Sequence, residues 1–269
     1  MSERLPSLFV SHGSPMFALE SGSTGPALNA WAQALVQRHG RPRGVLVLSP
    51  HWMARAPAVM GNPRPATWHD FGGFPQPLYQ LQYPAPGSVP LGLEVLDLLK
   101  EAGIAAQSDT QRPMDHGAWV PLMHLFPAAD VPVVQLALAL DAGPEQVLAL
   151  GAALQGLRAK GVLLLGSGSM THNLGEFFGG EREPLPYVLE FSRWVEDALN
   201  RGDRAALLDY RAQAPHAVRA HPSEDHFLPL FFALGAADDG AAVHYLSREV
   251  MHGILAMDAF ALQASATAP

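Results

Sequence analysis

The stretch GVLLLGSGSMTHN, residues 161–173, is a short apolar run that ends in a Gly/Ser turn and leads to His172. The same arrangement occurs twice nearer the N-terminus, where short apolar runs lead to His12 and His51. Apolar runs of this length between turn residues are typical of strands buried on both faces in a parallel sheet. Ligands of open α/β sheets bind beyond the carboxyl ends of the strands, so we expect the three histidines to converge on one site.

Apolar runs of strand length alternate with stretches of helical spacing along almost the whole chain. Strands are predicted over residues 5–10, 44–48, 104–106, 131–138 and 161–165, and a closing hairpin over 243–247 and 253–259. Helices are predicted over residues 25–39, 91–102, 115–126, 144–160, 183–199, 203–212 and 227–234. This alternation predicts a single α/β domain over residues 1–269, with a central, largely parallel or mixed sheet flanked by helices on both faces.

Residues 56–87 differ from the rest of the chain because proline and glycine recur throughout them and rule out long regular elements. Trp68, Phe71, Phe74 and Tyr83 lie within this segment. Flexible linkers are rich in glycine and serine and lack aromatic residues. We therefore expect an ordered loop that forms a wall of a substrate site.

The composition excludes several classes of protein. Hydrophobic residues make up 48% and charged residues 16% of the 269 residues, which indicates a globular chain. The net charge of −8 is spread without a basic stripe, so nucleic acid is not an expected partner. The N-terminus lacks a signal-peptide pattern, and no apolar run approaches the roughly 20 residues that span a bilayer. We expect a cytoplasmic protein without membrane contact, as a monomer or small homo-oligomer.

Histidine is the informative residue type, since the chain contains 12 histidines and no cysteine. Neutral imidazole is the commonest metal ligand, and three imidazoles leave the open position that a catalytic metal needs. His12, His51 and His172 are therefore predicted to serve a metal or catalysis. His226 and His221 both precede an apolar helix, and spacing alone does not decide which of them joins the site.

Other polar motifs leave alternatives open. His116 follows Asp115 at a predicted helix start, where it either exchanges protons near a substrate or lies at the surface beside a capping residue. His69 precedes Asp70, which either orients it or caps a turn. The segment around Ser167 lacks the spacing of a nucleophile elbow, so its glycines are expected to let the backbone approach a ligand. The phosphate-loop pattern is absent as well.

Seven motifs resemble the DODA-type extradiol ring-cleaving dioxygenases. They are SHGSPM at residues 11–16, SPHW at 49–52, HDFGGFP at 69–75, YPAPG at 83–87, DHGAW at 115–119, HNL at 172–174 and HFLPL at 226–230. That family is related to the catalytic subunit of protocatechuate 4,5-dioxygenase and belongs to the class III extradiol enzymes. The motifs occur in the family's order over nearly the whole chain, and together they are highly specific.

The resemblance implies roles for particular residues. His12, His51 and His226 would bind the metal, with His172 beside them as a fourth ligand or as an acid/base group. His116 would be the second catalytic group, in the substrate pocket. Contacts to the substrate are expected from three further residues of the motifs, namely His69, Trp52 and Tyr83.

The resemblance also implies the cofactor and the reaction. Non-haem Fe(II) is usually bound by two histidines and one carboxylate, whereas His226 occupies the carboxylate's position here. An all-imidazole set suits Fe(II), which oxygen chemistry requires, and also Zn(II) in its place. The implied reaction inserts O2 into a small aromatic diol, a DOPA-like or other substituted catechol, and opens the ring to a muconic semialdehyde. Arg55, Arg64 and Arg112 are alternative partners for a substrate carboxylate.

Two other functions fit the same histidines. A zinc hydrolase would use the metal to activate water at neutral pH. A non-catalytic protein would bind a metal or a catechol without turnover. The presence of both His172 and His116 as acid/base candidates favours an enzyme.

Overall fold

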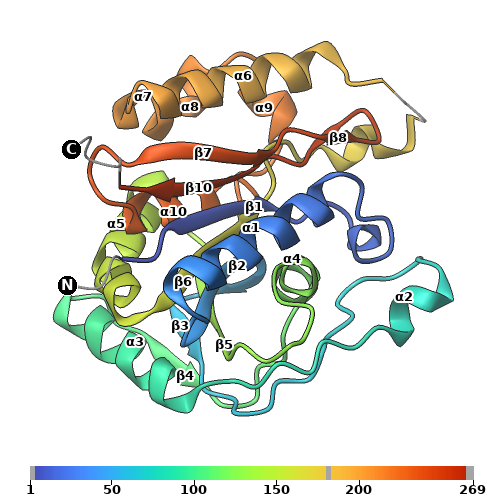
Figure 1. The fold of residues 1–269 in the computed structure, drawn as a ribbon. Helices are drawn as coiled ribbons and strands as arrows, with labels where there is room; N and C mark the ends of the chain where they lie inside the picture. The colour runs from blue at the N-terminus through green and yellow to red at the C-terminus, as the bar shows by residue number, and fades with distance from the viewer. Residues whose placement is uncertain (1–3, 180–182, 265–269) are drawn as a thin grey trace.

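The computed structural model describes residues 4–179 and 183–264, and eight strands form one mixed sheet at its centre (Figure 1). In spatial order they are β4 (Gln107–Asp109), β3 (Ala58–Met60), β5 (Val133–Ala139), β2 (Gly44–Ala54), β6 (Val162–Gly168), β1 (Ser7–Ser11), β10 (Ala259–Gln263) and β7 (Ala242–Ser247). Strands β5, β2, β6 and β1 are mutually parallel, whereas β3 is antiparallel to β5, and β10 to β1 and β7. The predicted α/β class with a largely parallel, mixed sheet is confirmed.

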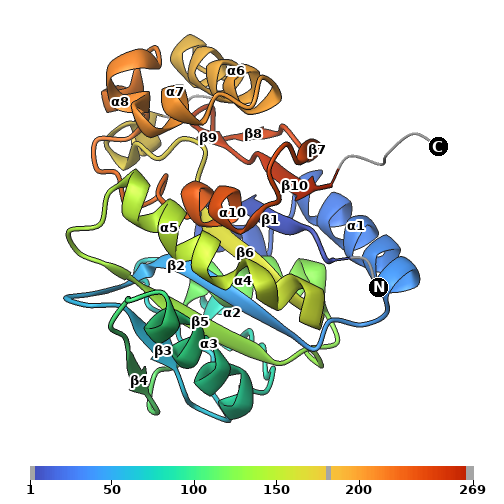
Figure 2. The ribbon, with the colours of Figure 1, turned by 90° about the vertical axis from the view of Figure 1, so that its left-hand side faces the viewer.

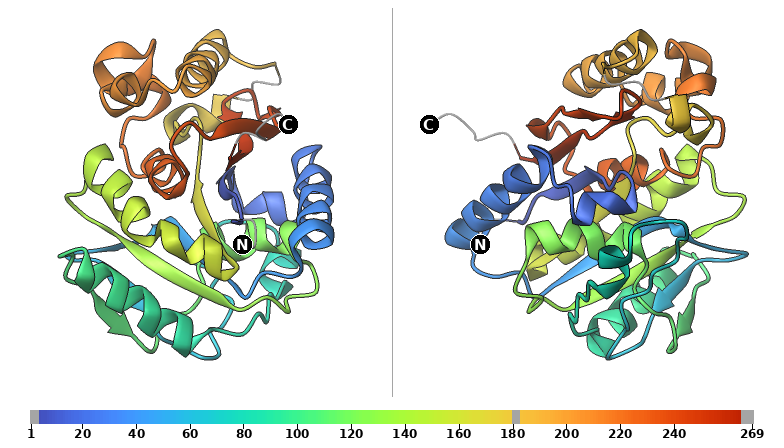
Figure 3. Two further views of the ribbon diagram at one scale, coloured as in Figure 1. Left: turned by 60° about the vertical axis from the view of Figure 1, so that its left-hand side comes forward. Right: turned by 90° about the vertical axis from the view of Figure 1, so that its right-hand side faces the viewer.

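Helices cover both faces of this sheet (Figure 3). Alternate residues of each strand point to opposite faces, so Val45 and Val47 belong to one apolar cluster and Leu46 and Leu48 to another. Helices α1 (Thr24–His39) and α4 (His116–Leu125) complete the first cluster. The second cluster is completed by α3 (Val89–Glu101), α5 (Pro144–Leu154) and α10 (Pro229–Ala236).

The remaining elements are short or lie at the margin of the sheet. Four helices gather beyond β7 and β10 (Figure 2), namely α6 (Pro186–Asn200), α7 (Arg204–Leu208), α8 (Tyr210–Gln213) and α9 (Ala217–Ala220). The rest are α2 (Gln76–Gln80), the small β8 (Val250–Met251) and β9 (Leu255–Ala256) ribbon, and the 3-10 helices η1 (Pro15–Ala18), η2 (Gln155–Lys160) and η3 (Leu174–Gly179). Among the described residues, no helix is long and apolar enough to cross a membrane.

Several predicted boundaries differ from the structure, and three of the differences are informative. The strand expected over 104–106 lies at residues 107–109, where it pairs with β3 at the sheet's edge. The helix expected over 203–212 is interrupted at Asp209, whose backbone angles (φ −100°, ψ 27°) are not helical. The last strand begins at Ala259 instead of residue 253, because it inserts between β1 and β7, with Phe260 opposite Phe9.

The glycines of β6 accommodate the protein's own chain, not a ligand as the sequence suggested. A Cβ atom on Gly166 would lie 2.0 Å from the carbonyl oxygen of Pro229. A Cβ atom on Gly168 would lie 2.3 Å from the carbonyl oxygen of His226. These two positions therefore let the segment that leads into α10 lie directly against the strand, and they fix where His226 is held.

Replacing Gly168 with alanine should lower the free energy of unfolding by about 1–3 kcal/mol, the usual cost of forcing extra atoms into a packed interior. Urea unfolding measures the change. Gly156→Ala is the matched control, since a Cβ atom there meets nothing within 4 Å and should leave stability unchanged or slightly higher. Equal stability of the two variants would contradict the close approach.

Asp258 is a buried carboxyl group beside the strand that carries His12. Its side chain is 3% exposed, and its carbonyl oxygen accepts a hydrogen bond from the Ser11 amide at 3.0 Å. Burial, reinforced by the negative charge of Glu196 and opposed by Arg248, raises the pKa of Asp258 to about 7. Between about pH 4 and pH 7 the folded protein therefore keeps a proton on Asp258. The unfolded chain, whose carboxyl pKa is about 4, has lost that proton.

The raised pKa of Asp258 predicts that stability falls as pH rises from about 4 to about 7, by up to about 1.4 kcal/mol per pH unit from this group. Asp258→Asn should remove that component and be the more stable protein at pH 8. Urea unfolding at several pH values measures it. The exposed Asp97→Asn provides the control, and parallel pH profiles for all three proteins would contradict the assignment.

Candidate metal centre and its cavity

Five histidines lie together at the carboxyl edge of the parallel strands. His12 follows β1, and His172 follows β6 by four residues. His51 lies within β2, which continues beyond its predicted end and shifts its pairing with β5 at this point. His116 is the first residue of α4, and His226 lies in the turn before α10.

Ligand atoms of three of these histidines are close enough to share one ion, and the rings of the other two lie beside them. The Nε2 atoms of His12 and His51 are 3.1 Å apart, and ligand atoms of His12, His51 and His116 all lie within 4.8 Å of one another. The His226 ring centroid is 5.4 Å from that of His12 and 5.0 Å from that of His51. His172 stacks on His226 with centroids 3.5 Å apart and planes at 6°. The structure thus brings together the three histidines predicted to converge, and beside them lie His226 and His116, which the family resemblance had placed in the same site.

The tautomer of His12 follows from its partner, Ser167. The Ser167 hydroxyl donates its one hydrogen to the Gly117 carbonyl oxygen, so its oxygen accepts from the His12 Nδ1–H group at 3.0 Å. Nδ1 therefore carries the proton, and the lone pair of His12 is on Nε2, which faces His51. Ser167 is an orienting group for an imidazole and not a nucleophile.

Two carboxylates orient two more rings in the same way. Asp225 accepts a hydrogen bond from His226 Nδ1 at 2.5 Å, and Asp70 accepts from His116 Nδ1 at 2.9 Å. Burial by itself would raise the pKa of each carboxyl group, but the hydrogen bonds and charge interactions with the histidines lower it. Both acids are therefore ionised, and because each binds Nδ1, Nε2 is the ring nitrogen left to face the centre of the cluster. The sequence suggested His69 as a partner of Asp70, whereas the structure gives it His116.

A buried polar network holds the backbone of His51. Ser49 accepts a hydrogen bond from the His51 amide at 3.2 Å, and Arg112 donates to the His51 carbonyl oxygen at 3.0 Å. Both side chains also bond to Asp115, which is fully buried and accepts a third hydrogen bond from Gln135 at 2.8 Å. Asp115 thus fixes a candidate ligand and does not cap α4 with its side chain.

Burial keeps three of these imidazoles neutral, those of His12, His51 and His172. Desolvation, followed by the proximity of the other histidines, lowers the pKa of His12 and of His51 well below the usual range. The same causes lower the pKa of His172 to about 3. Neutral imidazole is the form that binds metal ions, so these three rings require no deprotonation at neutral pH.

These residues fit a divalent metal ion. His226 Nε2 is buried and has no hydrogen-bond partner, a costly state for a lone pair unless a cation accepts it. The 3.1 Å separation of two Nε2 atoms is near the roughly 3.3 Å that two tetrahedral ligands at about 2.0–2.1 Å would have. Carboxylates behind ligating imidazoles are the usual outer partners of such ions.

The cluster opens into a cavity of about 570 Å³. Its lining consists of Gly13, Ser14, Pro15, His51, Phe71, Gly72, Gly73, Phe74, His116, His172, Leu174, Phe177, His226 and Leu255. The histidines form its floor, whereas the apolar walls come from the loops after β1 and β3 and from η3. The arrangement offers a small aromatic molecule both an apolar enclosure and polar contacts.

Comparison with known proteins supports this picture. Residues 6–257 match the family model of the catalytic LigB subunit of aromatic ring-opening dioxygenase. The chain belongs to the LigB family. It is therefore an oxidoreductase, and the resemblance to extradiol dioxygenases is confirmed.

Individual LigB relatives cover almost the whole chain. A 4,5-DOPA dioxygenase extradiol of Beta vulgaris is 36% identical over 94% of this chain and 94% of its own length. The protein of that name in Escherichia coli K12 is 35% identical over 88% of this chain and 87% of its own. A crystal structure of an uncharacterized Escherichia coli K12 protein superposes with a TM-score of 0.81 at 28% identity, and covers 96% of this chain and 100% of that one.

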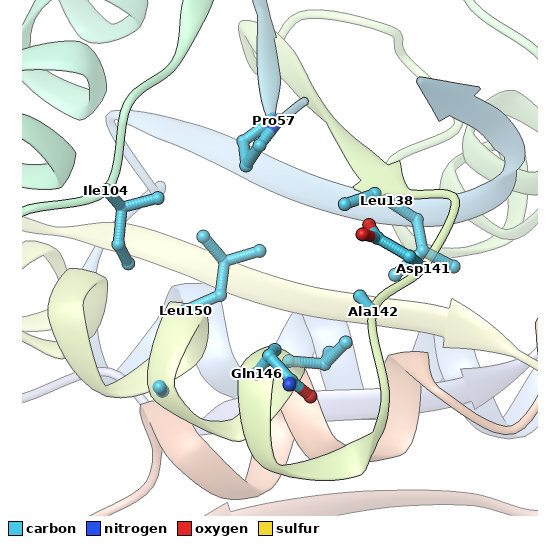
Figure 4. A pocket seen from close by; sticks show the side chains of 10 residues that line it. Pro57, Ile104, Leu138, Asp141, Ala142, Gln146 and Leu150 are labelled. Atoms are coloured by element: carbon cyan, nitrogen blue, oxygen red, sulfur yellow. The ribbon is translucent and has the colours of Figure 1, made fainter. Parts of the chain in front are cut away.

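A second cavity lies on the opposite face of the sheet from α4, between β5 and α5 (Figure 4). It measures about 320 Å³ and is mostly apolar, with Asp141 and Gln146 as its polar lining residues. None of the described residues around it is a histidine, so it is separate from the LigB centre.

Three residues predicted to contact substrate have other contacts in this LigB fold. The Tyr83 hydroxyl donates to the Phe126 carbonyl oxygen at 3.0 Å, and Trp52 is buried beneath the Arg112 guanidinium at 4.8 Å. His69 Nε2 bonds to a main-chain carbonyl at 3.1 Å. None of the three is among the described residues that line the cavity, and their role in binding substrate stays a prediction.

His221 is set apart from the cluster by its hydrogen bond. Its Nε2 donates to the Met170 carbonyl oxygen at 2.8 Å, and its ring packs on Phe191 and Phe227.

The sequence did not reveal the orienting roles of Asp225 and Asp70. The available signal was adjacency of an acidic residue to a histidine in the sequence. Adjacency pairs Asp225 correctly with His226, but it pairs Asp70 with His69 instead of His116.

Asp225→Asn should weaken Zn(II) binding by about 10- to 100-fold, the usual effect of removing an outer-sphere carboxylate from a ligating histidine. Competition with a fluorescent chelator measures the affinity. Asp239→Asn, with a side chain that is 95% exposed, provides the matched control and should bind Zn(II) as the unmodified protein does. Unchanged affinity in Asp225→Asn would separate His226 from the metal.

Proposed function

We propose that this protein is an extradiol dioxygenase that uses Fe(II), bound by His12, His51 and His226, to open the ring of a catechol. The observation that carries the proposal is the buried Nε2 atom of His226, which has no hydrogen-bond partner and lies beside two further imidazoles with converging Nε2 atoms. Membership of a ring-opening dioxygenase family supplies the reaction.

The third ligand is the point at which two assignments compete. His116 has a ligand atom within 4.8 Å of those of His12 and His51, so geometry alone permits it. His226 is favoured because its Nε2 is the buried atom without a partner. We therefore assign His116 to the substrate, with which it can exchange a proton.

When bound, the metal ion would favour ionised catechol hydroxyls and, as Fe(II), supply the redox chemistry that reaction with O2 requires. His116 Nε2 would accept a hydroxyl proton, and the Asp70 carboxylate on Nδ1 would stabilise the imidazolium that forms. The same group would return the proton to the ring-opened product.

His172 has a different electrostatic setting. Burial and its stacking partner His226 lower its pKa to about 3, so it stays neutral at pH 7. A neutral imidazole in the cavity would accept a hydrogen bond from the substrate, and we assign it as the second catalytic group. The phenyl rings of Phe71, Phe74 and Phe177 would exclude water from the reacting ring.

Oxygen uptake tests the function directly. Metal-free protein is reloaded anaerobically with Fe(II) or Zn(II), mixed with a panel of catechols, and exposed to oxygen. We expect stoichiometric uptake and a yellow semialdehyde with Fe(II) and none with Zn(II). Hydrolysis of an ester or amide by the zinc form, without oxygen uptake by the iron form, would support a zinc hydrolase instead.

His226→Ala and His116→Ala should separate ligand from acid/base group. His226→Ala should lose most bound Fe(II), because one of three ligands is gone, whereas His116→Ala should keep the metal and lose about 100-fold or more in kcat. Metal analysis and oxygen uptake measure both effects. His244→Ala, an exposed position on β7, controls for loss of a histidine. Metal loss in His116→Ala with retention in His226→Ala would reverse the assignment.

A further inference from the structure

Among the residues that the structure describes, the wall of the cavity beyond the histidines is apolar and has no charged side chain. Its side chains come from Pro15, Phe71, Phe74, Phe177, Leu174 and Leu255. No lysine, arginine, aspartate or glutamate is present among the described residues that line the cavity. The histidines can hold a diol, so a substituent on the ring would meet this wall.

Two carboxylates lie behind the cavity's histidines. Those of Asp70 and Asp225 accept hydrogen bonds from His116 and His226. A metal dication would be balanced by the ionised diol. A carboxylate on the substituent would therefore lose water without gaining a cationic partner.

Two arginines that border the site are already engaged. The Arg112 guanidinium lies 4.8 Å from the Trp52 ring and 4.9 Å from the Trp68 ring, and it donates to Asp115. Arg219 forms two hydrogen bonds with Glu176, the residue before Phe177. Neither lines the cavity, nor do Arg55 and Arg64, the other carboxylate partners that the sequence offered.

The cavity is also larger than a diol ring requires. Its volume of about 570 Å³ falls within the range of about 300–1,000 Å³ that holds drug-sized ligands. Gly72 and Gly73 contribute no side chain to this wall, and at these exposed positions an added Cβ atom would meet nothing within 4 Å. A hydrophobic substituent in the cavity would bury apolar surface.

We propose that this enzyme selects catechols whose ring substituent is uncharged and apolar, such as an alkyl or aryl group, over catechols that carry a carboxylate. This inference rests on the proposed function. The preference differs from the substrate in the names of its relatives, since DOPA carries both a carboxylate and an ammonium group.

A matched pair of catechols tests the preference, 4-propylcatechol against 3-(3,4-dihydroxyphenyl)propionate. We expect kcat/KM of the Fe(II)-loaded enzyme to be at least about tenfold higher for the propyl compound. Calorimetry with the redox-inert Zn(II)-loaded enzyme should show the same order in dissociation constants. Equal or tighter binding of the propionate would overturn the inference. Binding with the expected preference but no ring opening would instead count against the proposed function.

Leu174→Arg should weaken the preference, because it places a cation on the wall. Leu174 lines the cavity and is 54% exposed, so the substitution is compatible with folding. We expect the dissociation constant of the propionate divided by that of the propyl compound to fall about threefold, which is the size of effect that a solvent-accessible ion pair has. Leu174→Glu should raise the ratio.

Leu189→Arg is the matched control. This leucine is 43% exposed on α6 and does not line the cavity, so the ratio should stay unchanged. An unaltered ratio in both Leu174 variants would show that charge on this wall does not set the preference, and would overturn the inference.

Discussion

The convergence of buried imidazole nitrogens on one point is the constraint on which the rest of this structure depends. His12 and His51 approach to 3.1 Å between their Nε2 atoms, and His226 adds a buried Nε2 without a partner. Such a group is unfavourable in an apolar interior unless a cation binds it. The orientation of a ring is fixed by a hydrogen bond at its other nitrogen, Nδ1. Ser167 provides this bond for His12 and Asp225 provides it for His226.

A parallel sheet suits this constraint because the carboxyl ends of neighbouring strands meet at one edge. Strands β2, β6 and β1 are adjacent, so the residues that follow them are brought together whatever their distance in sequence. His226 comes from outside the sheet, and its position depends on the absence of side chains at Gly166 and Gly168. The strands therefore supply His12 and His51, and the packing of α10 against β6 adds His226 as the third candidate ligand.

Local patterns, an apolar run and the residue after it, predicted the fold class and three of the five histidines. Spacing alone did not decide between His226 and His221, since the choice depends on which ring turns toward the core, where His221 meets the Met170 carbonyl oxygen. The resemblance to family motifs was needed to name His226 and His116. The sequence could not predict the network of Arg112 and Asp115, because its members come from segments joined only by strand pairing. Aromatic residues of the loop carried no signal of which side they would face.

The cavity's two halves come from different kinds of structure. Imidazoles project from strand ends and helix starts that are tied into the core, whereas Gly72, Gly73 and Leu174 belong to loops and a 3-10 helix at the surface. Replacing surface segments disturbs few buried contacts. Substitutions in these few exposed residues can therefore reshape the cavity wall while the histidine cluster and the core beneath it stay intact.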